Sequence, residues 1–397
     1  TAILAYSVGR AGLCGFVVTA NQIEGRRLPV SSKDLTARVR NYVDLISMSD
    51  DDAWRVVGRR LSADLVAPLL PDGLGPIERV VILADGALNA LPFETLPVRD
   101  SSGESMLVER ASVSYAPSAT ALDALGREVD GPRAERSMLV VADPATDRPT
   151  GASGTAEIVR ALYDDEDLSI EPLPAALEEA GAIAGLASDA SVLTGAEATE
   201  AAMKTGGLDG FRIVHFATHG LVSVRAPYRS ALVLARGEDE DGFLQAREIY
   251  RLRMHSDLVV LSGCRTARGA TVEGDGVQGL AQAFLHAGAR SVVASLWNVN
   301  DERTATFMEA FYAHLARGAT KTDALRSAKL ELLRRAGTSA PRYWAPFVLI
   351  GESRRPVVFA HSGRSGGLAV ALGGAAGLLG ILGLAVAVRR RRARAAR

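Results

Sequence analysis

Two residue types that act together in acyl-transfer chemistry stand at the ends of two apolar segments. The segment FRIVHFATHG (211–220) ends in His219 and Gly220. The segment DLVVLSGC (257–264) ends in Cys264. Both segments are typical of buried strands, and in open α/β sheets the reactive groups lie at the carboxyl ends of strands. An imidazole beside a thiol lowers the thiol pKa and later protonates the leaving amine, so the pair is a candidate base and nucleophile.

The backbone beside these side chains offers a place for a negatively charged oxygen. N–H groups near Gly220 and Cys264 are candidate donors to such an oxyanion. From its position alone, Cys264 could equally be an inert thiol in the core at a strand end, because cysteine is among the residues most often buried as a small apolar group. Cys14 lies in an apolar strand pattern, and there we expect an inert thiol.

Other potentially reactive residues favour simpler interpretations. His215 precedes His219 by four residues, and with Cys264 the two histidines suggest a zinc site. No carboxylate ligand accompanies them, so we expect no metal and no cofactor. The stretch GASG (151–154) follows a strand but lacks the P-loop lysine and the dinucleotide-binding spacing, so we do not assign it to phosphate binding.

The elements that would position these residues alternate between strands and helices. Such alternation indicates an α/β fold with a largely parallel, buried sheet flanked by helices. The predicted strands are two within 1–20 around Gly9–Gly12, and 79–85, 137–144, 211–220, 231–235, 257–264, 291–297 and 344–351. The predicted helices are 33–47, 53–70, 155–163, 174–187, a stripe from Val277 to Leu285, 302–317 and 321–336.

Composition sets limits on the class of protein. The chain has 397 residues, of which 48% are hydrophobic and 23% charged, which excludes wholesale disorder. Two cysteines cannot form a disulfide framework or a structural zinc cluster. The net charge of −1 gives no reason to expect nucleic-acid binding. The charged, glycine-containing stretch at 126–136 is typical of a linker, so we place a domain boundary near residue 135. It separates a smaller N-terminal α/β part (1–135) from a second part (136–352).

Beyond a linker at 353–365, the chain changes character. Residues 366–388 contain no charged or hydrogen-bonding side chain, and 23 residues of helix span about 34 Å, enough for a hydrocarbon core of about 30 Å. We therefore expect one C-terminal transmembrane helix. Gly373 and Gly377 form a GxxxG pair, which suggests a dimer through this helix.

The tail at 389–397 holds six arginines. Removing them from the 45 Lys+Arg leaves 39 against 46 acids, a net charge of −7 for the rest of the chain. The positive-inside tendency favours a cytoplasmic tail. That orientation needs an export signal for the body, and none is visible, so the membrane face of the body stays open.

Several motifs together resemble one family. The blocks HFATHG and VVLSGCRTARG resemble the two signatures of CHAT domains, which belong to the caspase and separase group of cysteine peptidases. The similarity extends from about 135 to 351, and the N-terminal part is similar more weakly. The further blocks are LADGALNALPFETLP (83–97), GDGVQGLAQAFLHAGARSVVASLWNVND (274–301), ALRSAKLELL (324–333) and YWAPFVLIG (343–351).

The resemblance implies a caspase-like sheet, with a pseudo-caspase-like part in 1–135 and the catalytic part in 136–352. It makes His219 the catalytic histidine and Cys264 the nucleophile, and it makes the N–H groups of Gly220 and Cys264 the oxyanion donors. It implies cleavage of a protein or peptide substrate without metal or cofactor. The block LSGCRT departs from the QAC-type nucleophile motif of caspases, so aspartate specificity does not transfer.

The family also includes arginine- and lysine-directed enzymes. Asp257, Glu273 and Asp275 are candidates to pair with a basic P1 side chain, and the alternative is that they are solvated loop acids. Two other functions stay open: a silent or partner-activated CHAT scaffold, which fits an upstream sensor domain, and an acyl transferase that acts on a non-peptide group.

Overall fold

The fold is described from a computed structural model. The described residues are 1–9, 12–48, 52–100, 103–127, 134–146, 170, 172–223, 226–263, 275–299 and 301–359, with backbone alone for 100 and 275–278. The described residues all belong to one compact unit, which ends before His361. The predicted helix at 155–163 and the predicted membrane span at 366–388 lie outside the described residues. None of the described helices is long and apolar enough to cross a membrane.

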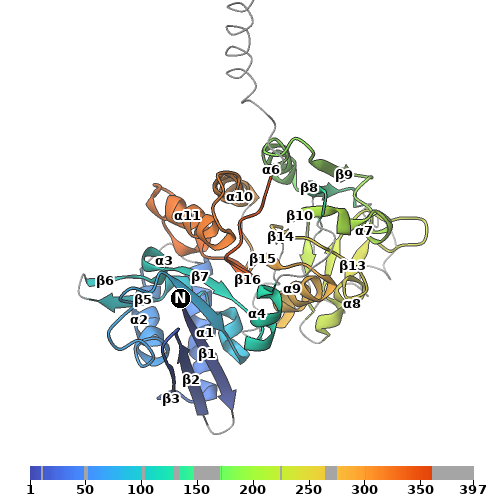
Figure 1. Ribbon diagram of the computed structural model, residues 1–397. Coiled ribbons are helices and arrows are strands. Elements are labelled where there is room, and N and C mark those ends of the chain that lie inside the picture. Colours follow the sequence, from blue (N-terminus) through green and yellow to red (C-terminus); the bar gives the residue numbers. More distant parts are fainter. Residues whose placement is uncertain are drawn as a thin grey trace, which may run out of the picture. The chain divides into compact units, whose positions relative to one another are not determined.

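A large, largely parallel sheet forms the centre of the first unit (Figure 1). Within the described residues it has eleven strands in the order β3-β2-β1-β4-β7-β16-β15-β14-β10-β8-β9. In that order the strands are β3 (Ile23–Leu28), β2 (Gly12–Val18), β1 (Ala2–Gly9), β4 (Arg79–Leu83), β7 (Ser112–Tyr115), β16 (Phe347–Gly351), β15 (Ser291–Ser295), β14 (Leu258–Leu261), β10 (Phe211–Ala217), β8 (Arg136–Pro144) and β9 (Ser191–Gly195). The predicted α/β class with a largely parallel sheet is therefore confirmed.

Nine of the eleven described strands form two parallel halves that run in opposite directions, and β2 pairs antiparallel with both β1 and β3 at one end of the sheet. β1, β4, β7 and β16 are mutually parallel, as are β15, β14, β10, β8 and β9. β16 and β15 pair antiparallel, with Val293 opposite Leu349. The carboxyl ends of the two halves therefore lie at opposite edges of the sheet, and the edge with the ends of β10 and β14 belongs to the second half.

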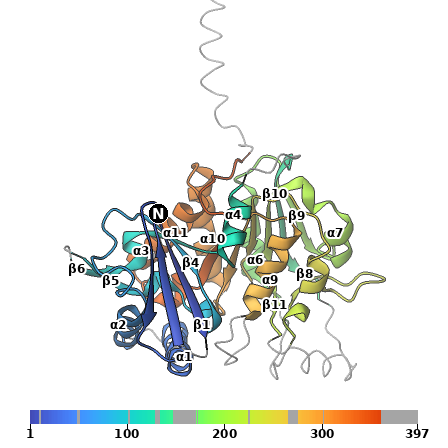
Figure 2. The same ribbon diagram turned by 60° about the horizontal axis from the view of Figure 1, so that its bottom comes forward.

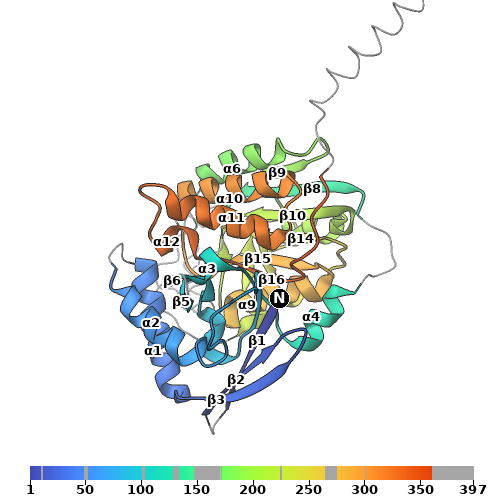
Figure 3. The same cartoon turned by 60° about the vertical axis from the view of Figure 1, so that its left-hand side comes forward.

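Helices cover both faces of the sheet. α6, α10 and α11 pack side by side on one face, and α4 and α9 lie on the other (Figures 2 and 3). The helices are α1 (Ser32–Met48), α2 (Trp54–Leu65), α3 (Leu107–Arg110), α4 (Ala119–Gly126), α6 (Pro174–Ala184), α7 (Glu200–Thr205), α8 (Ala246–Ile249), α9 (Asp275–Ala287), α10 (Asp301–Ala316), α11 (Lys321–Arg334) and α12 (Pro341–Trp344).

The middle strands are buried on both faces, which explains their continuous apolar sequences. Every residue of β14 and of β15 is buried, and β10 is buried at all positions except Arg212. Parallel strands between two helical layers have no solvent face, so they need no alternation of polar and apolar residues. The sequence pattern therefore identified these strands correctly.

Strands that lack this apolar signal were not predicted. β3 is the sheet edge, and five of its six residues are exposed. β7 and β9 are short, and the predicted strand at 344–351 begins only at Phe347, after α12. Two small sheets complete the fold: the hairpin of β5 (Pro97–Asp100) and β6 (Gly103–Met106), and the set of β11 (Gly220–Leu221), β12 (Ala231–Val233) and β13 (Phe243–Gln245).

The predicted boundary near residue 135 falls between β7 and β8. Strands from both sides of it belong to the one sheet, and β16 from the end of the second part pairs with β7 of the first. The division into parts 1–135 and 136–352 stays a prediction about chain organisation.

Candidate active site

The turn that presents His219 is fixed by bonds to a neighbouring strand. β10 ends at Ala217, and Thr218 and His219 follow it. The Thr218 hydroxyl donates to the carbonyl of Val233 in β12, and the Val233 N–H donates to the carbonyl of His219 at 2.8 Å. His219 is 4% exposed, so its ring is held within the structure at the end of the strand.

The end of β14 packs directly against this turn. The Ser262 N–H donates to the Phe216 carbonyl at 3.0 Å, which extends the β10–β14 pairing by one residue. At Gly263 the two backbones touch, since a Cβ there would lie 2.3 Å from the carbonyl oxygen of Thr218. Real Cβ atoms do not approach backbone oxygens so closely, so only glycine allows this contact. The residues that precede His219 and Cys264 are therefore in van der Waals contact.

A polar cavity of about 270 Å³ opens at this edge of the sheet. It lies where the ends of β10 and β14 meet the first turns of α6 and α10. Its lining includes His219, Ser262 and Gly263 from the strand ends, together with Glu179 and Asp301 from the helices. Ligands of open α/β sheets bind at such carboxyl edges, so this cavity is the candidate active site.

Asp143, at the end of β8, holds the first turn of α6 against the cavity. Its carboxylate oxygen Oδ1 accepts a hydrogen bond from the Leu173 N–H at 2.8 Å. Leu173 caps α6 and lines the cavity. Among the described residues, Asp143 is the one non-glycine residue with positive φ, at 41°. Left-handed backbone is uncommon outside glycine and is tolerated best by Asn and Asp, and it clusters at functional sites.

A buried hydrogen-bond network lies beneath the cavity. His215 in β10 is fully buried, and its Nε2 lies 2.7 Å from Glu179 Oε1 of α6. Its Nδ1 lies 3.0 Å from the Tyr312 hydroxyl of α10. The Ser262 hydroxyl lies 3.2 Å from His215 Nε2. Two strands and two helices therefore meet at one imidazole.

The protonation of Tyr312 orients this network. Burial, together with the nearby Glu179 carboxylate, raises the pKa of Tyr312 well above its usual value. The hydroxyl therefore stays protonated and can donate to Nδ1 of His215, while the Glu179 carboxylate is an acceptor for a proton on Nε2. We assign these roles from the chemistry of the partners.

Gly220 begins β11 and has a backbone amide that the ladder does not use. Gly220 faces Leu232 in the β11–β12 pair, and the bond from the Val233 N–H to the His219 carbonyl makes it a non-hydrogen-bonded pair. In this register the N–H of Gly220 points away from β12. The amide next to His219 is therefore left out of the β11–β12 hydrogen bonds.

The other predicted site residues have different places. Asp257 precedes β14 at its amino end, so it lies at the sheet edge opposite the cavity, 3.9 Å from Arg290. The structure thus does not bring Asp257 to His219. Asp275 begins α9, and its side chain lies outside the described part, as do Cys264 and Glu273.

Sequence reasoning missed two acids of the cavity, Glu179 and Asp301. Glu179 lies on the buried stripe of α6 with Ala176, Ala180 and Ile183. A carboxylate on an otherwise apolar helical stripe is a signal for a buried partner. Asp301 begins α10 after β15, at the same carboxyl edge as His219, so a search of every strand end would have found it.

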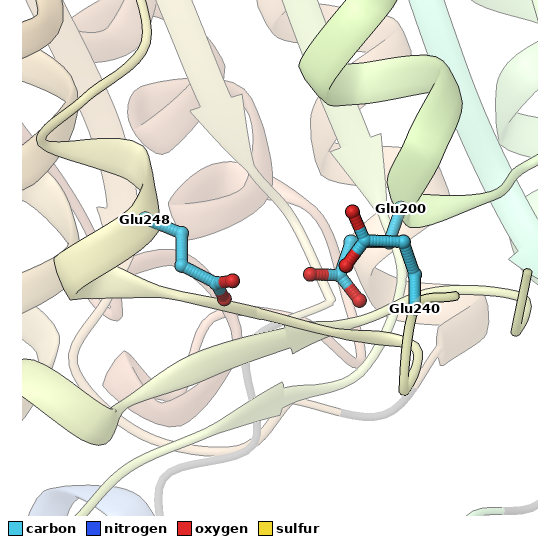
Figure 4. A group of neighbouring side chains, drawn as sticks. All are labelled: Glu200, Glu240 and Glu248. Atoms are coloured by element: carbon cyan, nitrogen blue, oxygen red, sulfur yellow. The ribbon is translucent and has the colours of Figure 1, made fainter.

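A second cluster of acids is already neutralised by a lysine. Glu200, Glu240 and Glu248 point toward one another (Figure 4), and among the described residues they are the one group of three spaced to hold a metal ion. The ammonium of Lys204 lies 2.7–2.8 Å from all three carboxylates. Burial lowers the pKa of Lys204, but these hydrogen bonds outweigh it and raise the pKa above its usual value. The Lys204 ammonium thus supplies the positive charge that a metal ion would supply at these three carboxylates.

Comparison with known proteins places the chain among relatives of different length. Tetratricopeptide repeat protein 28 of Mus musculus is 27% identical over 329 residues, and that of Homo sapiens is 29% identical over 330. Each match covers 72% of this chain and 13% of the relative. The chain therefore spans about an eighth of the length of these relatives.

Solved structures with a related arrangement are more distant in sequence. The separase–securin complex of Saccharomyces cerevisiae matches with a TM-score of 0.43 and 14% identity, over 70% of this chain and 16% of that one. The arginine-specific cysteine proteinase gingipain R matches with a TM-score of 0.44 and 9% identity, over 82% of this chain and 75% of that one.

The family itself follows from the sequence match. The model of the CHAT domain matches residues 55–352, which include His219, Cys264 and the cavity between α6 and α10. The matched range is well over half of the chain. The chain therefore belongs to the family of CHAT-domain proteins.

Proposed function

We propose that the protein is a cysteine endopeptidase of caspase-like type, with Cys264 as nucleophile and His219 as general base. The contact between the backbones of Gly263 and Thr218 carries this proposal, because it joins the two strand ends that lead to these residues. Cys264 follows Gly263 directly in the chain, and consecutive Cα atoms are about 3.8 Å apart. His219 and Gly263 both line the same cavity.

The chemistry follows from these groups. His219 accepts the thiol proton of Cys264, and the thiolate attacks the carbonyl carbon of the scissile peptide bond. The N–H groups of Gly220 and Cys264 stabilise the resulting oxyanion. His219 returns the proton to the leaving amine as the C–N bond breaks. A water molecule, deprotonated by His219, then hydrolyses the thioester and frees Cys264.

The charge of the cavity favours a basic P1 side chain. Glu179 and Asp301 line it, and no lysine or arginine is among its lining residues within the described part of the chain. Carboxylates pair strongly with guanidinium groups in partly desolvated sites. These two acids therefore replace Asp257 as candidates for P1 recognition, and Glu273 and Asp275 stay predictions.

Cleavage profiling on a diverse peptide library tests the peptidase. The full chain in detergent is compared with Cys264→Ala and His219→Ala, and Cys14→Ala serves as the matched control for loss of a thiol. We expect cuts by the unmodified chain and by Cys14→Ala only, with Arg or Lys enriched at P1. Cuts that persist in Cys264→Ala would refute the proposal.

A silent or partner-activated scaffold is the second candidate. The curated relatives are named as repeat proteins and are about eight times longer than the matched segment, which favours a module that acts beside other domains. A chain that cuts no peptide, and whose Cys264 reacts with iodoacetamide as slowly as in His219→Ala, would support this alternative.

We also propose that residues 366–388 anchor the protein in a membrane as a single span, with the arginine tail in the cytoplasm. The apolar length of the segment and the basic tail that follows it support the anchor. Deletion of 366–397 is expected to move the protein from the membrane fraction to the soluble fraction. A truncated protein that still sediments with membranes would contradict the anchor.

A further inference from the structure

We infer that His215 is a positioning residue of this site, which holds Glu179 and Ser262, two residues that line the cavity, in register with His219. The inference rests on the proposed peptidase function. His215 does not face the cavity itself, but two of its hydrogen-bond partners, Glu179 and Ser262, line it. Ser262 is followed by Gly263 and then by Cys264.

Stability alone gives no reason for a polar group at this position. His215 is fully buried, Glu179 is 2% exposed and Tyr312 is fully buried. Burying such groups costs free energy even when they are hydrogen-bonded, and apolar side chains of similar volume are often equally stable or more so. The flanking residues Val214 and Phe216 show that β10 is otherwise an apolar core strand.

The hydrogen bonds of His215 depend on direction, whereas apolar packing does not. The Nε2–H donates to Glu179 of α6, and the same nitrogen lies within hydrogen-bond reach of the Ser262 hydroxyl at the end of β14. Nδ1 lies 3.0 Å from the Tyr312 hydroxyl of α10. A hydrogen bond weakens steeply with misalignment, so the network specifies the relative placement of four elements.

The consequence concerns the distance between His219 and the thiol. The Ser262 N–H donates to the Phe216 carbonyl, and the Ser262 hydroxyl lies 3.4 Å from that carbonyl and 3.2 Å from His215 Nε2. The first residue after β14 is therefore fixed to two residues of β10, and loss of the ring leaves only the bonds to Phe216. A misplacement of about 1 Å between reacting groups costs up to roughly 100-fold in rate.

The test uses the full chain with His215→Leu, which removes the hydrogen bonds, and His215→Gln, which restores a donor near the position of Nε2. The exposed His255, at the amino end of β14, provides matched controls in His255→Leu and His255→Gln. Iodoacetamide alkylation of Cys264 is followed by peptide mass spectrometry, with Cys14 as the internal reference. The unfolding temperature of each variant is recorded, and kcat and KM are measured on the peptide that the library shows to be cut fastest.

The expected result is slower alkylation of Cys264 relative to Cys14 in His215→Leu, and a kcat lowered roughly 10- to 100-fold at nearly unchanged KM. His215→Gln is expected to recover most of the loss, and the His255 variants to match the unmodified chain. Equal alkylation and kcat in His215→Leu would overturn the inference. A loss that Gln does not rescue, together with a lowered unfolding temperature, would show a merely structural role and would also overturn it.

Two further comparisons separate the possible failures. If the unmodified chain and His219→Ala alkylate Cys264 equally and cut no peptide, the peptidase proposal fails and the role of His215 fails with it. If His219→Ala differs from the unmodified chain while His215→Leu does not, the inference about His215 alone fails. Should His215→Leu not fold, Tyr312→Phe removes a single hydroxyl from the network. A kcat and an alkylation rate unchanged in Tyr312→Phe and in His215→Gln would then overturn the inference.

Discussion

At the scale of single residues, Gly263 and Asp143 shape the cavity in ways that larger or apolar side chains would not allow. Gly263 allows the backbone of one strand end to touch the backbone of another, and Asp143 adopts a left-handed conformation while it holds the first turn of α6. Gly263 acts through its backbone, Asp143 acts through its backbone conformation and its carboxylate, and neither supplies a reacting group. The geometry of the site therefore depends on residues that a search for nucleophiles and bases overlooks.

Replacement of Gly263 by alanine tests this dependence. The new Cβ would lie 2.3 Å from the Thr218 oxygen, so the two strand ends must separate. We expect peptide cleavage to fall roughly 100-fold, measured as kcat/KM on the best library peptide. Gly181→Ala is the matched control, because nothing lies within 4 Å of its Cβ and the residue is inside α6. That control is expected to keep its activity and to gain up to about 1 kcal/mol in stability.

At the scale of elements, the site forms where parallel strands end and helices begin. Leu173, the residue before α6, is tied to the end of β8 by the Asp143 carboxylate, and α10 begins at Asp301 in the same cavity. The placement of α6 therefore decides where Glu179 lies. A change at the end of β8 is expected to reach the cavity through this helix.

Two substitutions at Asp143 test the hydrogen bond and the backbone conformation together. Asn keeps a side-chain oxygen and tolerates positive φ, whereas Ala keeps neither advantage. We expect Asp143→Asn to stay within about 0.5 kcal/mol of the unmodified chain and Asp143→Ala to lose about 1–3 kcal/mol. Urea unfolding measures both. Equal stability of the two variants would contradict a contribution from the bond to Leu173 together with the tolerance of positive φ.

Sequence patterns predicted the strands buried on both faces, because uninterrupted apolar segments such as 257–264 have few other interpretations. They also predicted His219 at a strand end beside a glycine. The pairing of strands was beyond reach, since nothing in the composition of β16 says that it lies between β7 and β15. Glu179 escaped notice because its partner, His215, is 36 residues away in the chain.

At the scale of the whole molecule, a buried ion pair and a side-chain hydrogen bond connect α11 to the N-terminal half. The Lys329 ammonium lies 2.7 Å from Glu94 Oε1, and both side chains are at most 2% exposed. The second oxygen of Glu94 accepts from the Tyr115 hydroxyl at 2.5 Å. Asp323, one helical turn and a half earlier, accepts from Ser112 at 2.6 Å. α11 is thus bonded to residues that precede it in the chain by more than two hundred positions.

Removal of Lys329 is expected to be costly. Lys329→Met leaves the Glu94 carboxylate buried without its cation, and breaking such a pair costs about 3–5 kcal/mol. The double variant Lys329→Met/Glu94→Gln removes the unpaired charge and is expected to recover most of that loss. Lys33→Met, at an exposed lysine of α1, is the control. Denaturant unfolding checks all three, and a double variant no more stable than Lys329→Met would contradict this account.

Asp323 gives the molecule a predictable response to acid. Burial alone would raise its pKa, but hydrogen bonds from Ser112 and Thr320 and the charge of Arg79 lower it below the usual value of 3.8. A carboxyl with a lowered folded-state pKa stabilises the fold above its unfolded-state pKa, and the contribution is lost as pH falls through the folded-state pKa. Asp323→Asn is therefore expected to be less stable than the unmodified chain at pH 7.

The same variant is expected to approach the stability of the unmodified chain as the pH falls below about 3.8. Thermal unfolding between pH 7 and pH 2.5 measures the difference. Asp72→Asn, at an exposed acid, controls for the loss of a surface charge. A difference that does not shrink toward low pH would exclude the ionised Asp323 as its cause.

The central position of β16 has a consequence for how the chain reaches its fold. Among the described strands of the large sheet it is made last and lies sixth of eleven, with five strands on each side. During synthesis, the edges of β7 and β15 that pair with β16 therefore stay unpaired until residues 347–351 have left the ribosome. Such edges are templates for association with other chains, and closing a sheet with so distant a strand is slow. Nascent chains halted before residue 347 are expected to need a chaperone to stay unaggregated. Chains that include β16 are expected to stay unaggregated without one.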